Sequence, residues 1–128
     1  MANELILIVE DNDKNRKLAR DLLQFKGYRV AEAESAEAGL ALAAAQPPDL
    51  VLMDIHLPGM NGIEARKRLR ADPATSAVPV IAFTASVMPQ DRSQITDAGF
   101  DGFVSKPINI KEFLAAIEVK LAARGRAA

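Results

Sequence analysis

The chain has 128 residues, 49% hydrophobic and 26% charged, which predicts one compact domain with its own core. Its 16 basic and 17 acidic residues give a net charge of -1, which argues against nucleic acid or an anionic membrane as a partner. Cysteine is absent, which excludes thiol catalysis, thiolate metal sites and disulfides and is consistent with the cytoplasm. The first apolar run, residues 5–9, is too short for a signal peptide or a membrane span.

Short apolar runs recur along the chain, at residues 5–9, 28–31, 50–53, 80–83 and 102–104. A stretch with helical spacing follows each run, which predicts five strand–helix units. The first, third and fourth runs are continuously apolar, as expected for strands buried on both faces, whereas the second alternates like an edge strand. We therefore expect an α/β fold: a doubly wound parallel sheet with right-handed crossovers and strand order 2-1-3-4-5.

The helices predicted to cover this sheet differ in how apolar they are. The first, Asp13–Phe25, is stopped by Gly27 and is expected to carry one apolar stripe, made of Leu18, Leu22 and Phe25. The last is expected to do the same with Phe113, Leu114, Ile117 and Leu121. The helix predicted for residues 88–98 has few apolar positions, so it is expected to be loosely held. The compact core of the single domain, 1–128, is expected to span about 4–123.

Polar groups of complementary kinds follow four of the predicted strands. Glu10 and Asp11 follow the first strand, Asp54 follows the third, Thr84 the fourth and Lys106 the fifth. In an open α/β sheet, ligands bind outside the carboxyl ends of the strands, near the point where strand order reverses. Helix capping explains acidic residues before the first helix, but it does not explain an acid, a hydroxyl and a lysine after the other strands. The pattern favours a functional site.

Three carboxylates in one crevice, those of Glu10, Asp11 and Asp54, repel one another unless a proton or a cation relieves them. A hard divalent cation suits oxygen ligands, which indicates Mg²⁺, with Mn²⁺ as a substitute. Lys106 adds a mobile positive charge that can pair with Asp54, and Thr84 adds a hydroxyl donor. The combination is typical of phosphoryl transfer and makes Asp54 the candidate nucleophile.

Five sequence blocks carry a resemblance to a known family. They are Val9-Glu10-Asp11-Asn12, Met53-Asp54-Ile55-His56-Leu57-Pro58, Asn61-Gly62, Phe83-Thr84-Ala85 and Ser105-Lys106-Pro107. In this order and spacing they resemble the signature of response-regulator receiver domains over essentially the whole chain. The pattern around Asn15, Phe103 and Ile108 is most similar to stand-alone regulators of the cell-division DivK type, and receivers of hybrid kinases also look similar.

The resemblance implies a flavodoxin-like (βα)5 fold and a role for each matching position. Asp54 would accept the phosphoryl group, assisted by Lys106 and Thr84. The implied phosphate contacts are Thr84, Ala85 and Lys106. The implied metal ligands are Glu10, Asp11, Asp54 and the backbone carbonyl of His56, whose side chain is not implicated. Thr84 and Phe103 would form the switch, and Pro107 would follow a cis peptide bond.

The resemblance also implies a place in a bacterial two-component phosphorelay with a role in the cell cycle, and therefore protein partners. A sensor histidine kinase or histidine phosphotransferase would donate the phosphoryl group. A downstream protein would bind the face formed by the helix predicted for residues 88–98, the strand at residues 102–104 and the last helix. The basic first helix is either a docking face for the donor or a solvated surface. We expect a cytoplasmic monomer or weak dimer, complete as a stand-alone chain because of Met1 and the short tail. It is consumed stoichiometrically, so it is not a turnover enzyme.

Two other functions remain open at this stage. The first is an interaction module of the same fold that works without phosphorylation, or a fragment of a larger regulator; the intact acid, hydroxyl and lysine argue against an idle site. The second is a Mg²⁺-dependent phosphohydrolase with Asp54 as nucleophile. His56 stands where such enzymes carry a second aspartate as general acid, and 128 residues leave little for a substrate-enclosing cap.

Overall fold

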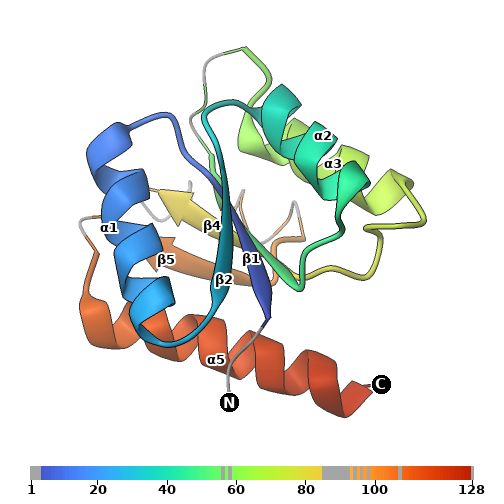
Figure 1. The fold of residues 1–128 in the computed structure, drawn as a ribbon. Helices are drawn as coiled ribbons and strands as arrows, with labels where there is room; N and C mark the ends of the chain where they lie inside the picture. Colours follow the sequence, from blue (N-terminus) through green and yellow to red (C-terminus); the bar gives the residue numbers. More distant parts are fainter. Residues whose placement is uncertain are drawn as a thin grey trace.

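A five-stranded parallel sheet with helices on both faces forms the protein in the computed structural model (Figure 1). The structure describes residues 4–55, 57, 59–84, 93, 95, 97, 99–106 and 108–127, with side chains up to residue 122. The strands are β1 (Leu5–Val9), β2 (Arg29–Ala33), β3 (Leu50–Asp54), β4 (Val80–Thr84) and β5 (Gly102–Ser105). Their spatial order is β2-β1-β3-β4-β5, which confirms the predicted flavodoxin-like topology.

The described helices are α1 (Asp13–Phe25), α2 (Ala36–Ala45), α3 (Gly62–Ala71) and α5 (Ile110–Ala127). Of the helix predicted for residues 88–98, only Ser93, Ile95 and Asp97 belong to the described residues, and all three are helical. Helices α1 and α5 pack on one face of the sheet and α2 and α3 on the other (Figure 1). None of the helices in the described part of the chain is long and apolar enough to cross a membrane.

The core lies in two layers, one on each face of the sheet. Strands β1, β3 and β4 are buried at every position, as their continuous apolar sequences predict, and β2 is the partly exposed edge strand that its alternation predicts. Phe113, Ile117 and Leu121 of α5 are buried against one face, and Leu114 packs beside them. This confirms the apolar set predicted for the last helix.

Helix α1 has the predicted bounds but a different buried face. Ala19 and Leu23 are fully buried and Leu22 packs at the border of the core, whereas Leu18 is 43% and Phe25 86% exposed. The prediction that Leu18 and Phe25 face the sheet is therefore wrong. Residues 19 and 23 lie one turn apart on the same side of the helix, and the small Ala19 lets the backbone approach the sheet, so residues 18 and 25 are turned toward solvent.

Candidate functional site

The register of the sheet brings the predicted site residues to one edge. Val9 of β1 pairs with Met53 of β3, so Glu10 and Asp54 follow side by side. On the other side of β3, Asp54 pairs with Phe83, one residue before Thr84. Thr84 in turn pairs with Ser105, one residue before Lys106. The parallel strands thus deliver two acids, a hydroxyl and an amine to neighbouring positions at their carboxyl ends.

Lys106 joins the two buried acids of the site. Its Nζ lies 2.7 Å from Oε2 of Glu10 and 3.1 Å from Oδ2 of Asp54, to which it donates a hydrogen bond. Glu10 has no exposed surface and Asp54 is 3% exposed, so this ammonium is a counter-ion inside the protein. The ammonium also lies 4.8 Å from the centroid of the Phe83 ring, and the backbone amide of Lys106 donates to the Thr84 carbonyl.

The loop between β1 and α1 presents the other acidic groups. Asn12 caps α1 by accepting a hydrogen bond from the Asn15 amide, so the predicted capping role of this acidic stretch is also present. The Asn12 amide donates to Oε1 of Glu10 at 3.1 Å, which fixes the glutamate side chain from the loop side. Asp11, between them, is exposed to solvent. The loop therefore holds one buried and one accessible carboxylate.

Charge and burial oppose each other at this site. Burial is the main influence that raises the pKa of Glu10; Lys106 lowers it, and the neighbouring Asp54 raises it further. Burial acts to lower the pKa of Lys106, but the carboxylates of Glu10 and Asp54 outweigh it and raise that pKa. A lysine held in its charged form between two acids leaves the site with an excess of negative charge.

The arrangement fits a hard divalent cation. Glu10, Asp11 and Asp54 each offer a carboxylate oxygen, and these oxygens lie within 4.8 Å of one another. The Oε2 atom of Glu10 is fully buried and is in ion-pair contact with Lys106 without hydrogen-bond geometry, so its lone pairs are incompletely used. An all-oxygen set with one exposed member suits Mg²⁺, which keeps several waters when it binds to proteins.

The start of α3 packs against the backbone at the end of β3, which carries Asp54. Asn61 caps this helix by accepting a hydrogen bond from the Glu64 amide. A Cβ at Gly62 would lie 2.4 Å from the carbonyl oxygen of Asp54 and 3.0 Å from the Cα of Ile55. Glycine is required at position 62 because the helix start touches the backbone that carries Asp54.

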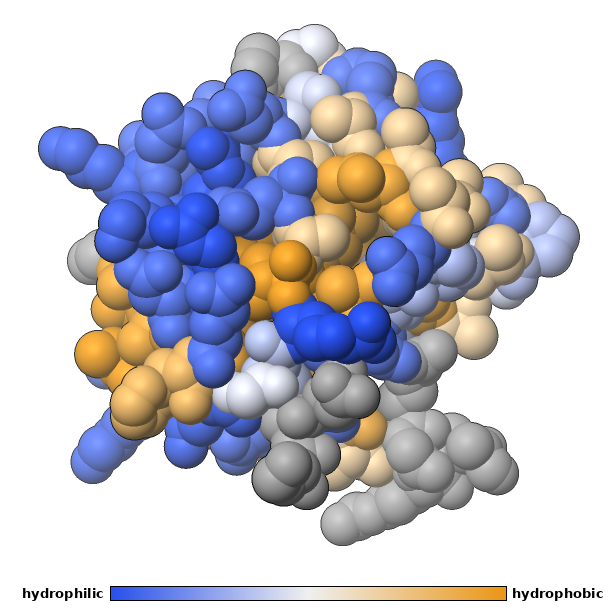
Figure 2. Space-filling view, in the orientation of Figure 1, coloured by the Kyte–Doolittle hydropathy of each residue, from blue (hydrophilic) through white to orange (hydrophobic). Residues whose placement is uncertain are grey.

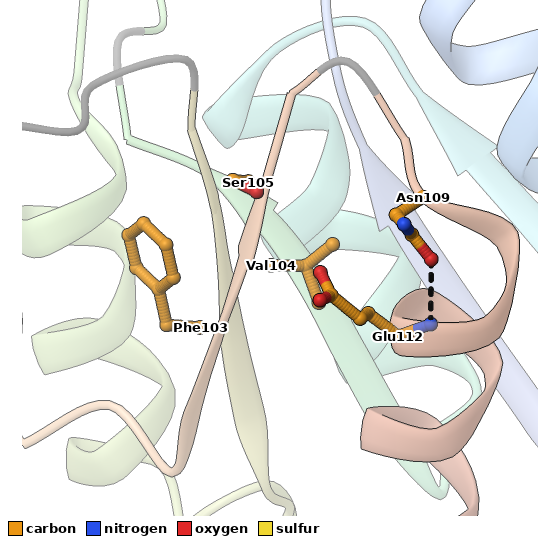
Figure 3. A pocket seen from close by; sticks show the side chains of 5 residues that line it. All are labelled: Phe103, Val104, Ser105, Asn109 and Glu112. Atoms are coloured by element: carbon orange, nitrogen blue, oxygen red, sulfur yellow. Dashed lines mark hydrogen bonds between the residues drawn. The ribbon is translucent and has the colours of Figure 1, made fainter.

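The two predicted switch residues lie on neighbouring strands. Thr84 is fully buried at the end of β4. Phe103 on β5 is partly buried against the small cluster of Ile55, Ala82 and Ile95. Figure 3 shows its ring on the opposite side of β5 from Glu112. A cavity of about 120 Å³ lies beside β5 and is lined by Phe103, Val104, Ser105, Asn109 and Glu112. Asn109 accepts a hydrogen bond from the Glu112 amide and so caps α5.

Three predicted site positions, His56, Ala85 and Pro107, lie outside the described residues. Sequence reasoning also missed contacts that the structure reveals. It paired Lys106 with Asp54, but the ammonium lies nearer to Glu10, and it assigned nothing to Phe83 beneath the lysine. Neighbouring strand ends were the available signal for the contact with Glu10, because Glu10 follows β1, Asp54 ends β3 and these two strands are paired.

Comparison with known proteins agrees with this geometry. Residues 6–118 match the response regulator receiver domain family. The chain belongs to this family: it is a receiver domain of the two-component signalling class.

Its relatives define it more narrowly. The chain is 42% identical over 113 residues to the polar-differentiation response regulator DivK of Brucella ovis, which covers 88% of this chain and 92% of that protein. A solved receiver domain of the sensor histidine kinase PA1611 from Pseudomonas aeruginosa PAO1 is 31% identical to this chain, with a TM-score of 0.87. The match covers 94% of this chain and 98% of that domain, which has a magnesium ion coordinated in its active-site cleft. The chemotaxis protein CheY4 of Vibrio cholerae is 26% identical with a TM-score of 0.86, covering 91% and 98%. The chain is thus a DivK-like receiver.

Proposed function

We propose that this chain is a phosphorylation switch in which Asp54 accepts a phosphoryl group from a phosphohistidine of a sensor histidine kinase or a histidine phosphotransferase. The observation that carries the proposal is the contact of Lys106 with Asp54 and Glu10 inside a cluster of three carboxylates. An interaction surface has no need of a buried ammonium between two buried acids. A site that receives a dianionic phosphoryl group does need such an ammonium, because the lysine is then already in place to pair with the phosphoryl oxygens.

The residues divide the chemistry among them. A carboxylate oxygen of Asp54 attacks phosphorus, the bond from phosphorus to the donor imidazole nitrogen breaks, and its electron pair stays on the imidazole. Glu10, Asp11, Asp54 and the His56 carbonyl would hold Mg²⁺, which when bound offsets the negative charge of the phosphoryl oxygens. Lys106 then exchanges its carboxylate contact for a phosphoryl oxygen. Thr84, Lys106 and the Ala85 amide complete the contacts of the phosphorylated state.

The output would be a change of surface around β5. Thr84 and Phe103 lie on adjacent strands, and the Phe103 ring is partly buried, so a movement of the threonine hydroxyl toward a phosphoryl group would be accompanied by a rearrangement of the aromatic ring. Such a coupled movement would alter the face formed by β5, α5 and the helix predicted for residues 88–98. We assign the downstream protein partner to this face. The face would have two arrangements in equilibrium, and phosphorylation would shift the equilibrium toward one of them.

The donor would dock beside the crevice, on the exposed part of α1. This helix starts at the loop that carries Asp11, and it presents Leu18 and Phe25 to solvent. Exposed apolar side chains on a partner surface contribute binding energy when the partner buries them. We assign the chain to the cytoplasm, where a sensor histidine kinase takes its phosphoryl group from ATP. Since each chain takes one phosphoryl group, it is consumed stoichiometrically and does not turn over an external substrate.

The test is the intact mass of the protein after incubation with acetyl phosphate, with and without Mg²⁺. We expect one phosphoryl adduct that needs the cation and is absent from Asp54→Asn. A protein that takes no adduct, and that shows no spectral change with beryllofluoride and Mg²⁺, would have an idle site and act as a phosphorylation-independent interaction module. Repeated turnover of a phosphate ester under excess substrate would instead indicate a phosphohydrolase.

A further inference from the structure

Arg16, in the first turn of α1, contacts one backbone carbonyl and three carboxylates around the acidic loop. Its Nη1 donates a hydrogen bond to the backbone carbonyl of Glu10 at 2.9 Å. Its Nη2 lies 2.5 Å from Oδ1 of Asp13 and 3.4 Å from Oε1 of Glu34, and its Nε lies 3.4 Å from Oε1 of Glu32. The side chain is 14% exposed. One guanidinium thus connects the end of β1, the start of α1 and the end of β2 with its following loop.

The contact with the Glu10 carbonyl restrains the peptide that links Glu10 to Asp11. The amide of Glu10 already donates to the Ala33 carbonyl at 3.0 Å, so both backbone polar groups of this residue are held. The orientation of this peptide decides the direction in which the Asp11 side chain leaves the backbone. Lysine cannot replace this restraint, because its single ammonium lacks the planar fork that reaches a carbonyl and separate carboxylates together.

We propose that Arg16 is a positioning residue for the divalent cation: it fixes the Glu10–Asp11 peptide so that the oxygens of the acidic cluster stay close enough to share one ion. The inference rests on the proposed function, since it requires the cation site of that proposal. Arg16 itself touches neither the cation nor the phosphoryl group. The oxygens in question are those of Glu10, Asp11 and Asp54, within 4.8 Å of one another.

A pure charge effect would act in the opposite direction. A positive charge near the site repels a divalent cation, so its removal would tighten binding if charge alone mattered. The guanidinium is, however, surrounded by the carboxylates of Asp13, Glu32 and Glu34, and the hydrogen bond to Asp13 is the main influence that raises the pKa of Arg16. The sign of the change in affinity therefore distinguishes positioning from charge balance.

The experiment is calorimetric titration of MgCl₂ into the full chain and its variants at neutral pH. We expect Arg16→Gln to raise the Kd for Mg²⁺ about tenfold, as loss of a residue that orients metal ligands usually does. The matched control is Arg20→Gln on the same helix. Arg20 pairs with the same Glu32, at 3.2 Å, and with Asp21, so we expect a change within about twofold.

A second variant separates the effect of the planar guanidinium group of Arg16 from the effect of its positive charge. Arg16→Lys keeps the charge, and we expect it to weaken binding nearly as much as Arg16→Gln, also at raised ionic strength. Unchanged or tighter binding in Arg16→Gln, or full affinity in Arg16→Lys, overturns the proposal. The amide resonances of folded Arg16→Lys, recorded by NMR, should change at Asp11 as well. A parent protein that binds no Mg²⁺ would overturn the cation site itself, an outcome distinct from loss of the Arg16 effect alone.

Discussion

Replacement of Lys106 by methionine tests whether the buried ammonium is the counter-ion of the site. Methionine keeps an unbranched stem of similar length over the Phe83 ring but leaves two nearly inaccessible carboxylates, Glu10 and Asp54, without their cation. Removal of one partner of a buried ion pair costs about 3–5 kcal/mol. Because the exposed Asp11 side admits solvent to the cluster, we expect the lower end, about 3 kcal/mol at pH 7.

The loss should depend on pH in a direction set by Glu10. Burial raises the pKa of Glu10 above its ordinary value of 4.5, so the contribution of this group to stability is full below that pH and falls as the pH rises through the higher folded pKa. Without Lys106, one of the influences that lower this pKa disappears and it rises further. The deficit of Lys106→Met relative to the parent should therefore be smaller near pH 4.5 than at pH 7.

The assay is urea unfolding followed by circular dichroism, since the chain has no tryptophan and one tyrosine. A loss of about 3 kcal/mol corresponds to a fall in Tm of about 10 °C for a domain of this size. Lys17→Met is the control: its ion pair with Asp21 is exposed, so we expect a change below about 0.5 kcal/mol. A deficit for Lys106→Met below about 1 kcal/mol, and equal at both pH values, would refute the counter-ion argument.

Two further substitutions test the geometry and the docking face. Gly62→Ala places a Cβ 2.4 Å from the Asp54 carbonyl, so we expect about 1–3 kcal/mol of lost stability and slower phosphorylation by acetyl phosphate; unchanged rate and urea midpoint would contradict the close approach. Phe25→Ser removes a side chain that is 86% exposed, so stability should change by less than about 0.5 kcal/mol while phosphotransfer from a cognate histidine kinase slows about fivefold. Equal slowing with acetyl phosphate would argue against a docking role for Phe25.

The regular part of the fold could be predicted because local patterns determine it. Continuous apolar strands such as residues 80–83 can only be buried on both faces, and parallel strands joined by helices leave few topologies. The same patterns placed Glu10, Asp54, Thr84 and Lys106 at one edge, because each follows a strand. The family blocks added roles that spacing alone does not supply, and these roles remain predictions for the phosphorylation experiment.

Tertiary packing decided what local patterns could not. Hydrophobicity alone placed Leu18 and Phe25 of α1 toward the sheet, but the close approach that Ala19 allows turned them to solvent. Sequence spacing likewise gives no sign that the Lys106 ammonium lies nearer to Glu10 than to Asp54, or that Arg16 reaches back to the Glu10 carbonyl. The sequence by itself determined which chemical groups reach the crevice, since strand order and strand ends follow from hydrophobic periodicity. Only the packed structure decided which of these groups touch, because contacts of a few ångströms depend on helix rotation and side-chain reach.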